Sequence, residues 1–150
     1  MKAVLQTKYG SPDVLKFVEL DKPFPKHDQA LIRVQAIGLN MADWRLLTGN
    51  PFFIRLMGLG KGKDPGSDMA GRVQAIGQEV EQFRPGDEVY GDIFSFGSGA
   101  FAEYVCLPEK ALAKKPSNLT FEQAAACRWQ RSPLCRACAT WDRSRRGKRF

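Results

Sequence analysis

Short stretches in which apolar and polar residues alternate recur through residues 1–126 of the chain. In residues 30–37 (ALIRVQAI), Leu31, Arg33 and Gln35 face one side of a predicted strand, and the residues between them face the other. Further stretches of this kind lie at residues 2–7, 14–20, 69–76 and 100–107. Turn-forming Gly and Pro residues separate them. The pattern predicts a small, mainly β barrel.

Two segments have helical character instead. Residues 40–48 (NMADWRLLT) precede a Gly-Asn-Pro stop, which is typical of a short helix and its end. Thr120 and Gln123 have the spacing of a capping box, so a second helix is predicted to begin there.

The net charge of +7 is distributed unevenly. Residues 127–150 hold seven Arg, one Lys and one Asp, whereas residues 1–126 contain equal numbers of basic and acidic residues. No stretch approaches the roughly 18 consecutive apolar residues of a membrane span. The first residues contain no apolar run typical of a secretion signal. We therefore expect a cytoplasmic protein with no membrane partner.

Four motifs occur in a specific order. They are AIGLNMAD at residues 36–43, PGSDMAG at 65–71, RPGDEVYG at 84–91 and GAFAEY at 99–104. In this order they resemble the GroES-like catalytic domain at the amino terminus of medium-chain dehydrogenase/reductases. The resemblance implies a mainly β fold over residues 1–126, namely a partly open β-barrel with short helices. We expect the Rossmann domain of the family to be absent from this chain.

The resemblance also indicates the subtype. Zinc-dependent members carry a cysteine where this chain has Asn40, and a His-Glu pair where it has Ser67 and Asp68. Zinc prefers thiolate and imidazole ligands, so a zinc-free member similar to quinone oxidoreductases is expected. Such enzymes use NADPH to reduce quinones or α,β-unsaturated carbonyls by hydride transfer. A small-molecule quinone or enone would then be the partner.

On the same resemblance, Asn40 and Asp43 are the candidate catalytic residues beside the nicotinamide, and Asn40 is also the candidate cofactor-binding residue. Trp44 and Phe94 are candidate flat walls of the substrate pocket. Simpler roles compete with these: Asn40 and Asp43 as helix caps, and Trp44 as a core residue. Turn roles are expected for Ser67 and Asp68.

Residues 127–150 depart from the family pattern after Ala126. We interpret this basic tail as the product of a frameshift, or of a sequencing error, that truncates the family sequence, and we expect it to be disordered. The chain as written would then be an inactive fragment that binds no NADPH. The alternative is a non-enzymatic β-barrel binding module with an Arg-rich arm, although nucleic acid is not the favoured partner.

The frameshift can be tested on the source DNA. If one base is missing near codon 126, each original codon takes its second base from the first base of a present codon. Present Cys, Trp and T-initial Ser codons would then conceal apolar residues, at the near-helical spacing 127, 129, 132, 135, 138 and 141. Sequencing is expected to yield an apolar helix followed by a Gly-rich turn in the shifted frame. A shifted frame that encodes neither of these would contradict the interpretation.

Overall fold

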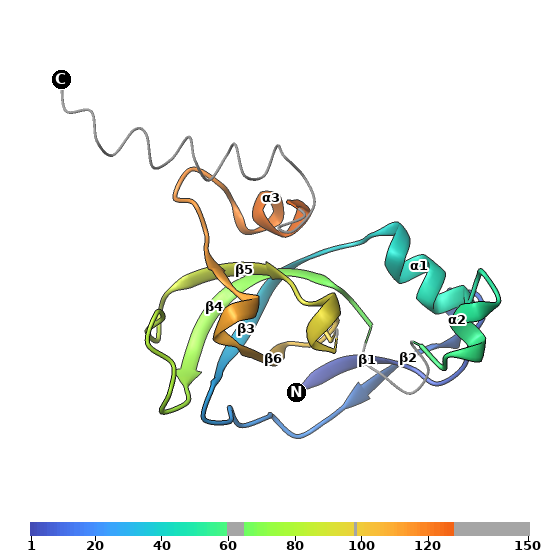
Figure 1. The fold of residues 1–150 in the computed structure, drawn as a ribbon, viewed down its shortest axis with the longest axis horizontal. Helices are drawn as coiled ribbons and strands as arrows, with labels where there is room; N and C mark the ends of the chain where they lie inside the picture. The colour runs from blue at the N-terminus through green and yellow to red at the C-terminus, as the bar shows by residue number, and fades with distance from the viewer. Residues whose placement is uncertain (60–64, 98, 128–150) are drawn as a thin grey trace.

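A five-stranded antiparallel sheet organises the protein in the computed structural model, which describes residues 1–59, 65–97 and 99–127. Its strand order is β6-β3-β4-β5-β7, so the two long strands β3 and β4 lie at its centre (Figure 1). The strands span Gln29–Gly38 (β3), Asp68–Ile76 (β4), Glu88–Asp92 (β5), Tyr104–Pro108 (β6) and Ala113–Lys114 (β7). The curved sheet and its short helices agree with the predicted GroES-like fold.

A second, two-stranded sheet closes the barrel at one side. Strands β1 (Lys2–Gln6) and β2 (Leu15–Glu19) pair antiparallel, with a 3-10 turn at Pro12–Val14 between them. The backbone N–H of Val4 donates to the Phe101 carbonyl at 2.9 Å, so β1 also contacts the segment that precedes β6.

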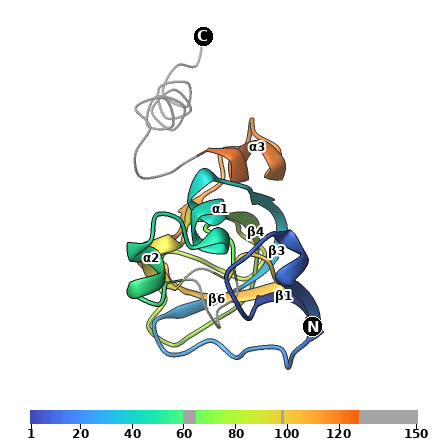
Figure 2. The same ribbon diagram turned by 90° about the vertical axis from the view of Figure 1, so that its right-hand side faces the viewer.

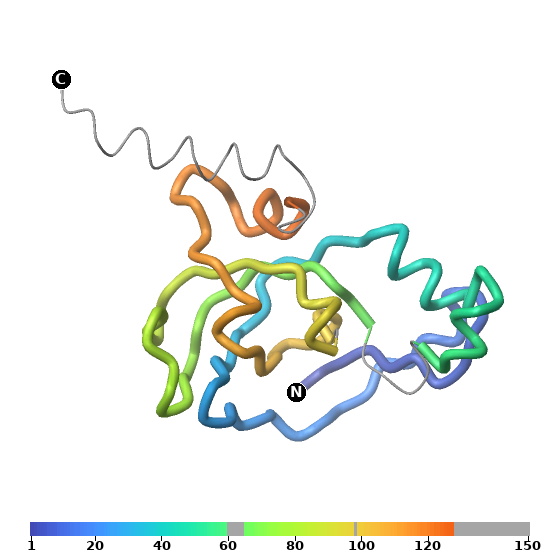
Figure 3. The backbone as a smooth tube through the Cα atoms, viewed as in Figure 1, coloured from blue at the N-terminus to red at the C-terminus, as the bar shows by residue number. Residues whose placement is uncertain are grey.

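Three short α-helices complete the described residues. Helices α1 (Met41–Thr48) and α2 (Phe53–Leu56) form an excursion between β3 and β4 that projects from one end of the sheet (Figures 1 and 3). Helix α3 (Phe121–Ala126) packs over β3, β4 and β5. Figure 2 shows α3 on a different side of the sheet from α2. Two 3-10 turns lie at Phe94–Phe96 (η2) and Glu109–Ala111 (η3).

The apolar core fills the space inside the curved sheet. Its largest fully buried side chains include Ile32, Met69, Val73, Ile93 and Leu107. A smaller apolar cluster under α3 joins Ala124 and Ala125 to Ala70 and Tyr90. Many of the apolar residues in the alternating stretches therefore lie in the core of the barrel.

Helix α3 begins where the sequence predicts. The Thr120 hydroxyl accepts from the backbone N–H of Gln123 at 3.2 Å, and the Gln123 side chain accepts from the backbone N–H of Thr120 at 3.0 Å. The backbone N–H of Glu122 and the Thr120 hydroxyl hold the pKa of the exposed Glu122 carboxyl below its usual value. The capping box confirms this helix start.

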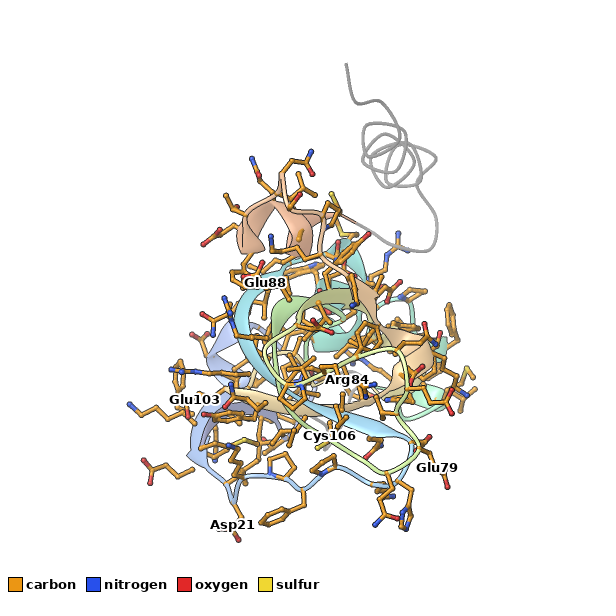
Figure 4. The ribbon with its side chains drawn as sticks, turned by 90° about the vertical axis from the view of Figure 1, so that its left-hand side faces the viewer. Asp21, Glu79, Arg84, Glu88, Glu103 and Cys106 are labelled. Atoms are coloured by element: carbon orange, nitrogen blue, oxygen red, sulfur yellow. The ribbon has the colours of Figure 1, made fainter. Side chains whose placement is uncertain are left out.

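A nearly buried lysine fastens the segment before α3 to the sheet. The Lys115 ammonium lies 3.1 Å from a carboxylate oxygen of Glu88, and its nitrogen also donates to the carbonyl of Leu119. Glu88 lies beneath α3 in Figure 4. The ion pair therefore fixes the approach of the chain to α3.

Two strand predictions need correction. Strand β3 shifts its register with β4 between Leu31 and Ile32 and again between Val34 and Ala36. Leu31 is buried, although Arg33 and Gln35 on its predicted side are exposed. The predicted strand at residues 100–107 begins only at Tyr104. The backbone N–H groups of residues 99–101 bond instead to the carbonyls of Pro65 and Gly66.

Cys106 is half-buried on β6, and burial raises the pKa of its thiol. No helix among the described residues is long and apolar enough to cross a membrane. The predictions for the basic tail concern residues 127–150, of which residues 128–150 lie outside the described residues.

Gly38 offers a test of the packing between β3 and α3. A Cβ atom on Gly38 would lie 2.5 Å from the carbonyl oxygen of Ala125 and 3.1 Å from the Cβ of Asp68. We expect Gly38→Ala to lower the free energy of unfolding by about 1–3 kcal/mol, because α3 has to move away from the sheet. Urea unfolding measures the effect. The exposed Gln35→Ala on the same strand is the control, and equal stabilities of the two variants would contradict the packing.

Candidate functional site

The junction between β3 and α1 places the first candidate residues. Asn40 is the N-cap of α1, with extended backbone (φ −119°, ψ 160°), and Asp43 is the third residue of the helix. The Asp43 carboxylate accepts from the backbone N–H of Asn40 at 2.8 Å, and the Asn40 side chain faces the backbone N–H of Asp43. Both residues are therefore helix caps, the simpler role that the sequence offered for them.

The start of β4 lies against this junction because Gly38 at the end of β3 pairs with Asp68. The Ser67 hydroxyl donates to Oδ1 of Asp43 at 2.7 Å, and Nδ2 of Asn40 donates to Oδ2 of Asp68. Asp43, Ser67 and Asp68 are buried, whereas Asn40 is half-buried. We call these four residues the polar quartet.

The hydrogen bonds fix the orientation of the Asn40 amide. An ionised carboxylate only accepts, so the amide nitrogen of Asn40 has to face Asp68. One N–H of this nitrogen is used by Asp68, which leaves a second N–H as a donor.

Among the described residues Asp43 has no ion-pair partner. Its position in the first turn of α1 is favourable because the helix amino terminus carries partial positive charge.

A groove of about 780 Å³ opens beside the quartet. Trp44 from α1 and Phe94 from η2 both line it, whereas Asn40 and Asp43 do not. Trp44 is 51% exposed and Phe94 47%, so neither ring is a core residue. The remaining lining residues are Met41, Ala42, Arg45, Leu46, Thr48, Asn50, Pro51, Phe53, Ile54 and Leu59.

Sequence reasoning misplaced one member of the quartet and missed one wall of the groove. The turn role expected for Asp68 was wrong, because Asp68 is the first residue of β4. Ser67 lies in a bend just before this strand, and the side chains of both residues bond to α1 or its cap. Helix α2, which contributes Phe53 and Ile54 to the groove, was not predicted. Its four residues are too few to show helical periodicity, so no pattern in the sequence indicated it.

A family model for the alcohol dehydrogenase GroES-like domain matches residues 26–117, more than half of the chain. The chain belongs to this family. Within it, the similarity is to quinone oxidoreductases of the medium-chain dehydrogenase/reductase type, as the motifs implied.

Individual relatives and solved structures also resemble this chain. The chain is 40% identical over 139 residues to the 2-methylene-furan-3-one reductase of Solanum lycopersicum, covering 84% of this chain and 34% of that protein. Among solved structures, the quinone oxidoreductase of Coxiella burnetii superposes with a TM-score of 0.77 at 32% identity, covering 85% of this chain and 41% of that one. The quinone oxidoreductase of Escherichia coli, solved in complex with NADPH, gives 0.70 at 27% identity, covering 84% and 36%.

This GroES-like chain therefore spans less than half the length of each of these proteins. In the described residues every strand pairing is antiparallel. The parallel βαβ unit that cradles a dinucleotide pyrophosphate is thus not found in this part of the chain.

Two of the four quartet side chains lack the ligand atoms that zinc prefers. Asn40 offers an amide and Ser67 a hydroxyl, and both are engaged with carboxylates. No group of three or more His, Cys, Asp or Glu side chains that could hold a metal occurs in the described part of the GroES-like domain. Of the positions that the resemblance relates to zinc ligands, Asn40 is hydrogen-bonded to Asp68, and Ser67 is hydrogen-bonded to Asp43.

Ser67 gives a test of this network. Ser67→Ala removes one of the two donors to the buried Asp43 carboxylate, and we expect a loss of about 1–3 kcal/mol in the free energy of unfolding. Chemical denaturation followed by circular dichroism measures the loss. Ser95→Ala, at an exposed position of η2, is the matched control and should change stability little. A Ser67→Ala variant as stable as the control would contradict the network.

Proposed function

We propose that this domain forms the substrate side of an NADPH-dependent reductase that transfers hydride to quinones or other α,β-unsaturated carbonyls without zinc. The observation that carries the proposal is the aromatic groove beside the polar quartet. Trp44 and Phe94 offer ring faces, which suit a flat conjugated substrate. The similar proteins named for reduction of quinones and of a methylene-furanone support the same substrate class.

The proposal assigns Asn40 to the nicotinamide and to substrate orientation. Its amide is held by Asp68 and keeps one N–H available as a donor. A carbonyl oxygen on the cofactor or the substrate is the fitting acceptor. Because the amide is preorganised, little reorganisation is needed when negative charge develops on that oxygen. Asp43 orients α1 and Ser67, and is a positioning residue in this proposal.

NADPH supplies the hydride when it is bound, as in the NADPH complex of the E. coli quinone oxidoreductase. Quinones and enones are already polarised by conjugation, so no Lewis acid is required in the proposed reaction. Arg45, Thr48 and Asn50 are the polar residues of an otherwise apolar groove, which limits the water around a bound ring.

Binding of a quinone to the 150-residue chain tests the substrate half of the proposal directly. Trp129 and Trp141 are replaced by Phe, so that Trp44 alone fluoresces. Titration with ubiquinone-0 is expected to quench Trp44 saturably, because the ring binds against it. Phe94→Ala should weaken binding about tenfold through loss of the second aromatic wall.

Phe24→Ala serves as the control, since Phe24 is exposed and does not line the groove. It should leave the dissociation constant of ubiquinone-0 unchanged. Linear, non-saturating quenching in the parent chain would show only collisions and would sink the proposal. The zinc-free part is tested separately by metal analysis: stoichiometric zinc that disappears in Asn40→Ala would overturn it.

A further inference from the structure

The groove has two chemically different walls. Helix α1 and turn η2 supply the aromatic rings of Trp44 and Phe94. Helix α2 and the residues that flank it supply an apolar wall made of Pro51, Phe53, Ile54 and Leu59. In Figures 1 and 2, α2 lies at the end of the molecule, next to α1.

The groove is larger than a single ring system needs. Its volume of about 780 Å³ lies in the upper part of the range of about 300–1,000 Å³ for pockets that hold drug-sized ligands. A quinone ring against Trp44 and Phe94 would leave the α2 side of the groove unfilled. Thr48, one of the polar lining residues, already donates its hydroxyl to the Trp44 carbonyl at 2.9 Å. The unfilled side is thus mainly apolar.

The α2 wall is held in place before any ligand binds. Ile54 is buried, and the Arg55 guanidinium donates to the carbonyls of Thr48 at 2.9 Å and Gly49 at 3.2 Å. The Tyr9 hydroxyl donates to the carbonyl of Leu59 at 2.9 Å. These hydrogen bonds connect α2 and the residues after it to the end of α1 and to the loop that follows β1. Because this wall is already ordered, it loses little conformational entropy when a ligand binds.

Resting on the proposed function, we infer that the α2 side of the groove binds an apolar tail of the substrate. The preferred substrates are then quinones or enones with an extended alkyl or prenyl side chain, rather than bare rings. The ring binds against Trp44 and Phe94, and the tail runs along Phe53, Ile54 and Leu59. Burial of the tail against this wall provides the added affinity because apolar surface leaves water.

Two quinones with the same head group test the inference: ubiquinone-0, which has no tail, and decylubiquinone. Binding of each to the full chain is measured by quenching of Trp44, in the background without Trp129 and Trp141. Decylubiquinone is expected to bind at least about tenfold more tightly, since burial of a few methylene groups is sufficient for that gain.

Phe53→Ala should reduce this preference to about threefold or less, because decylubiquinone loses more affinity than ubiquinone-0. Leu56→Ala is the matched control: Leu56 is on the same helix and 78% exposed, and it does not line the groove. It should retain the full preference. Thermal melting of both variants verifies that they fold.

The outcomes separate the two proposals. If neither quinone quenches Trp44 saturably, the proposed function fails. If both bind with equal affinity, the substrate half of the function stands and the tail site is overturned. A preference that is the same in Phe53→Ala and Leu56→Ala also overturns it, because the tail would then bind elsewhere. Equal weakening of both quinones in Phe53→Ala does so too, because Phe53 would contact the ring.

Discussion

A buried carboxylate has to find hydrogen-bond donors, and two such groups, Asp43 and Asp68, fix how α1 leaves the sheet. Asp68 is on a central strand that is paired on both sides, so its position is set by the sheet. It binds the Asn40 amide, while Asp43 binds Ser67 and the backbone of Asn40. The first turn of α1 is thereby tied to the beginning of β4.

The direction of α1 has consequences for the groove. Trp44 directly follows Asp43 in the first turn of α1 and lines the groove, so the quartet sets the start of the helix that carries this ring. Helix α2 is in turn bound to the end of α1 through Arg55. A polar network that resembles a simple helix cap thus positions both walls of an apolar binding surface. In an unpaired state its buried carboxylates would instead destabilise the domain.

The hydrogen bonds of the quartet also suggest how the junction between β3, α1 and β4 can be held together without a metal ion. A metal ion joins side chains from separate strands by coordination, and its binding energy contributes to folding. Here neutral donors meet carboxylates at the positions that the resemblance relates to zinc, and no described group has the ligands for a metal. Hydrogen bonds can hold such a junction together. They do not polarise a substrate as a cation does, which is consistent with a substrate that is already conjugated.

The sequence by itself determined strands β1, β2, β3, β4 and β6, the helix starts at Asn40 and Thr120, and the family. These features depend on local alternation, on capping chemistry and on motifs that are short enough to be recognised in a single chain. It also identified Trp44 and Phe94, which are 50 residues apart and line one groove.

Only the tertiary structure decided that Asn40 meets Asp68 and that Ser67 meets Asp43. Those pairs depend on the register of β3 with β4, and the register shifts within β3 cannot be read from a period-two pattern. Helix α2 belongs to the same class of feature. Its four residues are too few to show the periodicity of a helix. The helix is held by hydrogen bonds to Tyr9, which is distant in sequence, and to Gly49 at the end of α1.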